Sequence, residues 1–356
     1  MLKLNGVTRR YDDIVALDGL DLTVPDDTYL SLLGASGAGK TTLLRLIAGY
    51  EEPNEGEVLL NGERLDGKPP HRRDIGFVFQ NFALFPHLSV ANNVSFGLRY
   101  REVGAIQSKA EITERTENAL ELVGLGGYGH RGVAEISGGQ RQRVALARTL
   151  VAEPRIVLLD EPLGALDANL RARMCDELRM IRERLKVSFL HVTGSETEAL
   201  TMGDAVAVLA DGKIVQIDDS RTLFTQPSNP AAARHLNAWN ILPGVVEGGA
   251  LRTSVGLLPI VERVADNTPV QLAVRFDEIG VCDPARVPEA HDHFEATYVT
   301  GEFNGPTALS FFRTPDGELI QVVDYLNDAR LPDLKEGRTY ALHFSPETAV
   351  LFKGAA

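Results

Sequence analysis

Residues 34–41 have the types and the spacing that bind phosphate groups. They read Gly-Ala-Ser-Gly-Ala-Gly-Lys-Thr and fit the pattern G-x-x-x-x-G-K-[S/T]. Because glycine has no Cβ, consecutive backbone N–H groups can converge on phosphate oxygens, and Lys40 adds a positive charge. The Thr41 hydroxyl is suited to ligate Mg²⁺. We therefore predict a phosphate-binding loop made of Gly34, Ala35, Ser36, Gly37, Ala38, Gly39, Lys40, Thr41 and Thr42.

The segments around this loop are those that a phosphate site needs. Residues 28–33 predict a strand, and residues 42–48 predict a helix that ends at Gly49. The phosphates would then lie at a helix N-terminus, where free N–H groups and the helix dipole favour an anion. An ordinary glycine turn is the alternative. It is disfavoured because Lys40 and Thr41 stand at the lysine and threonine positions of the motif.

A second segment, residues 156–161, joins an apolar run to two carboxylates. The four residues Ile-Val-Leu-Leu precede Asp160 and Glu161. This pattern is typical of a parallel strand buried on both faces, with acidic residues at its carboxyl edge. We assign Asp160 to a metal ion and Glu161 to an attacking water. A core strand that runs into an acidic loop is the alternative.

A third segment, residues 137–140, reads Ser-Gly-Gly-Gln and opens a segment with helical patterning over residues 141–151. A turn of small residues at the start of a helix can bind a second anion through N–H groups and the helix dipole. If this segment stood alone, an N-cap serine before an amphipathic helix would be the better interpretation.

Together with Gln80 and Asp167, these segments resemble the ATP-binding subunit of an ABC transporter over nearly all of residues 1–235. In that family they are called Walker A, Q-loop, signature, Walker B and D-loop. The resemblance implies ATP and Mg²⁺ as cofactors, and two chains paired head to tail as a homodimer or with another ABC subunit. ATP on the Walker A loop of one chain is then covered by the signature of the other.

The same resemblance gives roles to individual residues. Catalysis falls to Glu161, Lys40 and Gln80, and the metal ligands are Thr41, Gln80 and Asp160. Beyond the phosphate-binding loop, the nucleotide is contacted by Tyr11, which matches an adenine-stacking aromatic, and by Ser137, Gly138, Gly139, Gln140 and Asp167.

Residues 70–98 resemble the importer branch that serves polyamines, ferric iron, sulfate, molybdate and maltose. In that branch Gln80 and the helical subdomain contact integral-membrane permease subunits, and a solute-binding protein takes part indirectly. The apolar residues Phe82, Leu84, Phe85 and Leu88 then form either a docking face or ordinary core. By analogy, polyamine (spermidine or putrescine) is the first expectation for the cargo and ferric iron the second.

One position departs from the family pattern. The family has a histidine near the γ-phosphate after the last buried strand, and here Gly194 follows the strand predicted over residues 188–193. His191 is a poor substitute for that histidine. It lies three residues before Gly194, and side chains an odd number of residues apart on a strand point to opposite faces. We interpret His191 as a core residue. The departure leaves open a weakly hydrolytic or regulatory ABC subunit as the alternative function.

Composition excludes other classes of protein. The 356 residues carry a formal net charge of −13, and residues 241–356 alone hold nine basic and 17 acidic residues, so we expect no nucleic-acid partner. No apolar run approaches the roughly 18 residues that span a bilayer. We therefore expect a cytoplasmic chain that is peripheral on the inner face of the cell membrane.

These patterns predict two domains. Residues 1–235 are expected to form an α/β P-loop NTPase domain of ABC type, with a RecA-like core, an antiparallel β subdomain and a helical subdomain over about residues 82–150. Short β-prone runs separated by Gly, Pro, Asp and Asn predict a small all-β, OB-like (TOBE) regulatory or dimerisation domain over residues 236–356. A His-Asp-His cluster at residues 291–293 is interpreted as an exposed turn rather than a metal site.

Overall fold

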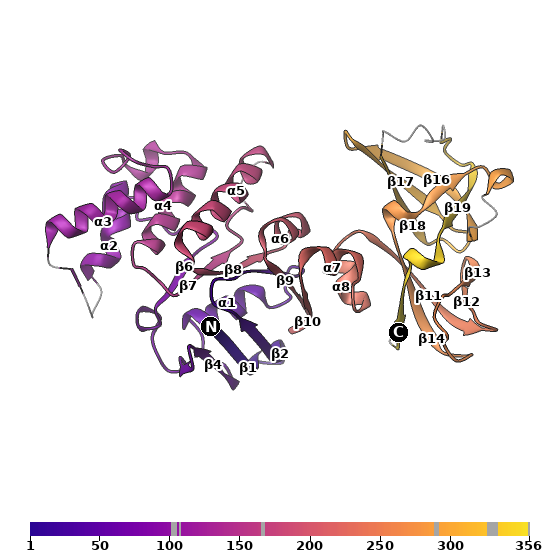
Figure 1. Cartoon of the computed structure of the whole chain (residues 1–356), viewed down its shortest axis with the longest axis horizontal. Helices are drawn as coiled ribbons and strands as arrows, with labels where there is room; N and C mark the ends of the chain where they lie inside the picture. Colours follow the sequence, from indigo (N-terminus) through magenta and orange to yellow (C-terminus); the bar gives the residue numbers. More distant parts are fainter. Residues whose placement is uncertain (101–104, 107, 165–167, 288–291, 326–333, 355–356) are drawn as a thin grey trace. The chain divides into compact units, whose positions relative to one another are not determined.

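The computed structural model describes residues 1–100, 105–106, 108–164, 168–287, 292–325 and 334–354 (Figure 1). The chain divides into two compact units, Met1–Leu223 and Phe224–Ala356. The division precedes residue 235, the boundary that the sequence predicts.

The centre of the first unit is a six-stranded sheet in the order β10-β9-β3-β8-β7-β6. Five neighbouring strands are parallel, and β10 pairs with β9 in the antiparallel sense. Every residue of β3, β7 and β8 is buried, and for β7 this agrees with the burial on both faces that its apolar run predicts. The strands are β3 (Tyr29–Leu33), β6 (Ile75–Val78), β7 (Ile156–Asp160), β8 (Ser188–Thr193), β9 (Ala205–Ala210) and β10 (Lys213–Asp218).

A second, antiparallel sheet has the order β2-β1-β4-β5. It comprises β1 (Leu2–Tyr11), β2 (Ile14–Val24), β4 (Glu55–Leu60) and β5 (Glu63–Arg64). Leucine and valine side chains of this sheet share one buried cluster with helix α1 (Lys40–Ala48) and the six-stranded sheet. The helix that carries the predicted phosphate loop is therefore packed between the two sheets.

Helices α2 (Val90–Tyr100), α3 (Lys109–Leu122) and α4 (Gly138–Leu150) lie together, in magenta in Figure 1. They share a buried apolar cluster with β7 and with α5 (Ala168–Leu185). Helix does not begin at residue 82, where the sequence predicts the helical subdomain to start. Phe82 and Ala83 have positive φ angles of 62° and 46°, which an α-helix does not accommodate. The first helix of this subdomain, α2, starts at Val90.

The remaining elements of the first unit connect and close the parallel sheet. Helix α6 (Glu196–Met202) joins β8 to β9, and α7 (Ser220–Thr225) contains the division between the units. A hairpin joins β9 to β10, and its turn residues Asp211 and Gly212 both have positive φ angles, as a type I′ turn requires. Within the described part of the chain, every helix is too short or too polar to cross a bilayer.

In the part of the second unit that the structure describes, the only helices besides 3₁₀ turns are the end of α7 and α8 (Pro230–His235), and the rest is strand and loop. Two five-stranded sheets have the orders β13-β12-β11-β14-β20 and β15-β19-β16-β17-β18 and enclose one apolar core. The strands are β11 (Trp239–Glu247), β12 (Ala250–Thr253), β13 (Gly256–Pro259), β14 (Pro269–Arg275), β15 (Gly280–Cys282), β16 (Asp292–Phe303), β17 (Thr307–Arg313), β18 (Leu319–Tyr325), β19 (Thr339–Phe344) and β20 (Val350–Lys353).

The prediction of an exposed turn at residues 291–293 is wrong for residues 292 and 293. Asp292 and His293 begin strand β16, where they pair with Phe344 and His343 of β19. His291 lies outside the described residues.

Candidate nucleotide-binding and hydrolysis site

The predicted phosphate loop joins β3 to α1, and its neighbours demand glycine at two positions. A Cβ on Gly34 would lie 2.6 Å from the carbonyl oxygen of Leu209. Gly39 has a φ of 103°, and a Cβ there would lie 2.4 Å from the carbonyl oxygen of Ala16. The loop therefore sits against the backbones of β9 and β2, and its N–H groups are left at the start of α1.

Lys40 is the first residue of α1, and its side chain folds back into the loop. The ammonium donates to the carbonyl oxygens of Gly34 (2.8 Å) and Ala35 (2.9 Å), and it lies 3.8 Å from Glu161 Oε1. Burial lowers the pKa of Lys40, and the Glu161 and Asp160 carboxylates counteract this. The two carbonyl oxygens accept hydrogen bonds from the ammonium, as phosphate oxygens would when a nucleotide is bound.

Asp160 ends strand β7 beside the start of α1. Its Oδ1 accepts a hydrogen bond from the Thr41 hydroxyl at 3.3 Å, and only 8% of the residue is exposed. Burial raises the pKa of Asp160, and the bond from Thr41 opposes that rise. One carboxylate beside a hydroxyl suits Mg²⁺, which binds few protein oxygens and keeps water and phosphate oxygens as its other ligands.

Glu161 and Gln80 meet although 81 positions separate them in the chain. Gln80 follows β6, and its Nε2 donates to Glu161 Oε2 at 3.1 Å. Glu161 has a φ of 44°, and its N–H donates to the carbonyl oxygen of Val192 at 3.0 Å. The backbone of β8 thus fixes the turn that presents the Glu161 carboxylate next to Lys40.

Ser137 caps helix α4 in a reciprocal arrangement with Gln140. The Ser137 hydroxyl accepts from the Gln140 N–H at 3.3 Å, and the Gln140 side chain accepts from the Ser137 N–H at 2.9 Å. Among the described residues, no hydrogen bond or ion pair joins Ser137, Gly138, Gly139 or Gln140 to the phosphate loop of the same chain. Asp167 lies outside the described residues.

Gly194 follows β8, is exposed, and lacks the positive φ that would demand glycine. A Cβ there would have its closest contact at 3.9 Å, with the carbonyl oxygen of Gly34. The position thus faces the phosphate loop and has room for a side chain. The Ser195 hydroxyl accepts from the Glu198 N–H at 3.4 Å and caps helix α6.

His191 is a core residue, as the sequence indicates. It is 0% exposed, and its Nδ1 lies 3.1 Å from the Tyr29 hydroxyl. Burial lowers the pKa of His191 to about 3, so the imidazole is neutral at physiological pH.

Sequence reasoning missed a groove of about 630 Å³ between the sheet and the helical subdomain. Aromatic side chains supply much of its lining (Tyr50, Phe77, Phe79, Phe85 and Phe96). Arg148 of α4 also lines it and donates to the carbonyl oxygens of Phe82 (2.8 Å) and Ala83 (2.7 Å). Of the four predicted apolar residues, Phe85 lines the groove, whereas Phe82 and Leu84 pack on the core.

Comparison with known proteins agrees with this geometry. The family model described as ABC transporter matches residues 17–164. The spermidine/putrescine import ATP-binding protein PotA of Rubrobacter xylanophilus is 40% identical over 366 residues, covering 99% of this chain and 94% of that protein. The Fe(3+) ions import ATP-binding protein FbpC of Brucella abortus is also 40% identical, with 92% and 91% covered.

Among solved structures, the dimeric ATP-binding cassette MJ0796, in a post-hydrolysis state bound to ADP and Pi, has a TM-score of 0.55 and 31% sequence identity. The match covers 62% of this chain and 99% of that one. The matches to PotA and FbpC cover 99% and 92% of this chain, so the similarity includes the all-β unit. The chain therefore belongs to the ABC transporter family, as the ATP-binding, ATP-hydrolysing subunit of an importer.

Proposed function

We propose that Lys40, Thr41, Asp160, Glu161 and Gln80 form the hydrolytic centre that drives this importer. The observation that carries the proposal is the convergence of the two carboxylates, the ammonium and the Gln80 amide at the start of α1. The N–H groups of the loop bind the phosphates, and Lys40 exchanges its two carbonyl partners for β- and γ-phosphate oxygens.

Thr41, Asp160 and Gln80 would hold Mg²⁺, which neutralises charge on the phosphates when it is bound. Glu161 orients and deprotonates the attacking water for in-line displacement at the γ-phosphate. Gln80 donates to Glu161 and so fixes the direction in which the carboxylate points.

The covering side of the site is proposed to come from a second chain. Ser137 and Gly138 are exposed at the start of α4, and no polar contact in the described residues occupies them with the phosphate loop of their own chain. In a head-to-tail pair, the N–H groups of Ser137–Gln140 and Asp167 would meet ATP on the partner's loop, with Tyr11 of that partner against the adenine. Two solved structures of the MJ0796 cassette, which has a similar fold, are dimeric.

The aromatic groove is proposed to receive a permease subunit at the inner face of the membrane, and a solute-binding protein would act through that subunit. Tyr50 is 52% exposed although it is a large aromatic residue. A groove with such a lining, next to Arg148 and close in sequence to Gln80, suits an apolar helix with a few polar groups. We further propose polyamine as the cargo, on the strength of the PotA relatives. Ferric iron is the second candidate, because an FbpC relative has the same identity of 40% over 92% of this chain.

Phe96→Asp tests the docking groove. We expect retention of the membrane subunits during purification from native membranes to fall about tenfold or more, because docking would bury an unpaired charge. Met180→Asp is the matched control, since Met180 is 61% exposed on α5 and does not line the groove. Equal retention by both variants, with unchanged ATP turnover of the isolated chain, would show that the permease docks elsewhere.

Gly194→His tests the departure from the family pattern. We expect slow turnover in the natural chain and a rise of up to roughly 10²–10³ in the variant, the usual effect of one preorganised donor at the transition state. The backbone at position 194 permits the substitution, because an added Cβ has its nearest contact at 3.9 Å and φ is not positive. Ser195→Ala should change the rate little, because that hydroxyl caps α6. The account is wrong if the natural chain hydrolyses ATP briskly and neither change alters its rate under identical Mg-ATP.

A further inference from the structure

Three consecutive residues after α1 connect parts of the molecule that the chain order keeps apart. Tyr50 packs on Phe77 of the groove, with ring centroids 5.8 Å apart. Glu51 turns toward Tyr11 at the end of β1, and Glu52 turns toward Arg73. The segment thus lies between the candidate base-binding aromatic and the helix that carries the phosphate loop.

Tyr11 is held on two sides. Its hydroxyl donates to the Glu51 carboxylate, and the Arg9 guanidinium lies over its ring, 4.6 Å from the centroid. Arg9 is itself paired with Glu51, with Nε 3.3 Å from Oε2. A cation on one face of the ring leaves the other face for a base, and the fixed hydroxyl stops the ring from swinging away.

Glu51 is also tied to α1. Its Oε1 lies 3.7 Å from Arg45 Nη1, and its side chain is 16% exposed although it is charged. The backbone repeats the link, because the Tyr50 N–H donates to the carbonyl oxygen of Arg45 at 2.9 Å. One carboxylate therefore joins the end of β1 to the helix whose first residue is Lys40.

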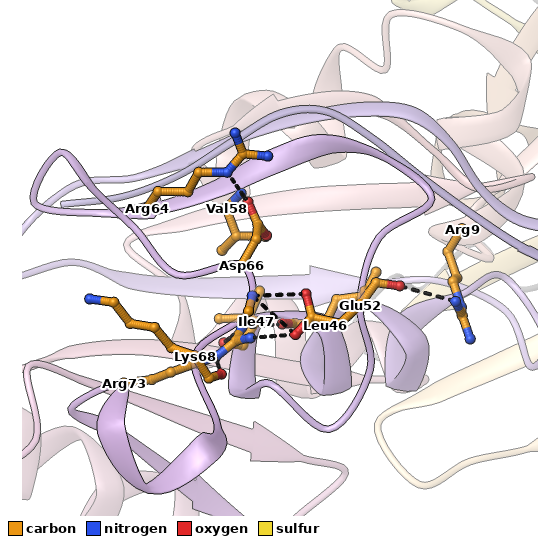
Figure 2. Close-up of polar contacts among 10 residues, drawn as sticks. Arg9, Leu46, Ile47, Glu52, Val58, Arg64, Asp66, Lys68 and Arg73 are labelled. Carbon is orange, nitrogen blue, oxygen red and sulfur yellow. Dashed lines mark hydrogen bonds and ion pairs between the residues drawn. The ribbon is translucent and has the colours of Figure 1, made fainter.

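Hydrogen bonds of Arg73 and Arg9 keep this segment in place (Figure 2). The Arg73 side chain is 1% exposed and donates to the carbonyl oxygens of Leu46 (2.8 Å) and Ile47 (3.1 Å) and to Glu52 Oε1 (3.2 Å). Arg9 Nη1 donates to the Glu52 carbonyl oxygen at 3.0 Å. A change at Glu51 would thus act on Tyr11 without freeing the main chain around it.

From this arrangement we infer that Glu51 is a positioning residue for the nucleobase. It sets the place of Tyr11 relative to α1, so that the base and the phosphates of one ATP are bound together. The inference rests on the proposed function, in which Tyr11 stacks on the base and the loop before α1 binds the phosphates. Its consequence is specific, since removal of Glu51 should weaken binding through the base and leave binding through the phosphates unchanged.

The test compares affinities for Mg-ATP and for Mg-tripolyphosphate, which has the phosphates but no base. For Glu51→Ala we expect the ratio of the two affinities to fall about three- to tenfold, the usual net effect of losing one hydrogen bond at an exposed site. Tripolyphosphate affinity should stay constant. Glu51→Gln should restore part of the ratio, because its amide oxygen can still accept from Tyr11. Glu63→Ala is the matched control and should leave the ratio unchanged, because this exposed carboxylate on β5 pairs with Lys68 and not with Tyr11.

Tyr11→Phe should lower the ratio as Glu51→Ala does, and the double variant should be no worse than either single one. An equal loss of affinity for ATP and tripolyphosphate in Glu51→Ala would overturn the inference, because it would indicate a general structural role. So would an unchanged ratio in Glu51→Ala when Tyr11→Ala lowers it. If Tyr11→Ala itself leaves the ratio unchanged, the assignment of Tyr11 to the base is wrong, which is a failure of the proposed function.

Discussion

The Lys40→Ala variant is expected to fold and to lose tight binding of Mg-ATP. Lys40 supplies the ammonium of the loop, buried beside two carboxylates. Without it, Asp160 and Glu161 face the phosphates with no fixed positive side chain between them. Charge-assisted hydrogen bonds are about twice as strong as neutral ones, so the loss should reach about 10²-fold or more in affinity, measured by titration of the folded protein.

Two further variants separate charge from geometry. Lys40→Arg keeps the charge, but its planar guanidinium does not fit between the carbonyl oxygens of Gly34 and Ala35, so we expect little recovery of affinity. Lys3→Ala removes an exposed lysine from β1 and should leave affinity unchanged. Unchanged affinity for ATP in folded Lys40→Ala would disprove the phosphate-loop assignment.

Local pattern sufficed to predict the elements that carry the chemistry. The strand before the loop, the helix end at Gly49 and the buried strand that ends in Asp160 follow from motifs and apolar runs within a few residues. Gly49 illustrates the reason. It adopts a φ of 84° at the helix C-terminus, a conformation that glycine favours for lack of a Cβ, so its type alone marks the boundary.

The contacts that hold the site together could not be predicted in this way. Arg73 reads as an ordinary charged residue, yet it is buried because the main-chain carbonyl oxygens of α1 and the Glu52 carboxylate satisfy its donors. Arg148 likewise binds carbonyl oxygens at Phe82 and Ala83. Such partners lie tens of positions away, and no local periodicity encodes them.

The all-β unit shows the same limit in another form. Its six longer strands contain apolar runs that the sequence reveals. The short strands β12, β13, β15 and β20 have three or four residues each, too few to show alternation. They are strands because longer neighbours supply hydrogen-bonding partners, as when Val350–Lys353 pairs with β14.

The Glu161→Gln variant is expected to bind ATP, to hydrolyse it roughly 10²–10⁴ times more slowly, and to accumulate as a closed dimer. Glutamine keeps the shape of the side chain but is too weak a base to take the proton from water. Binding should survive, because Glu161 is assigned neither to the phosphates nor to the metal. Burial is the main cause of the raised pKa of Asp160, and the negative charge of Glu161 adds to it. Its removal leaves Asp160 more readily ionised for the metal.

The hydrogen bond to Gln80 can also survive, since the amide oxygen of a glutamine at position 161 can accept from Gln80 Nε2 in place of the carboxylate. Only the chemical step is then lost, and the ATP that holds two chains together persists. Light scattering with Mg-ATP should show a dimer that the natural chain forms only transiently. Glu114→Gln, an exposed change on α3, should behave as the natural chain does. Normal turnover by a monomeric Glu161→Gln would mean that another group activates the water.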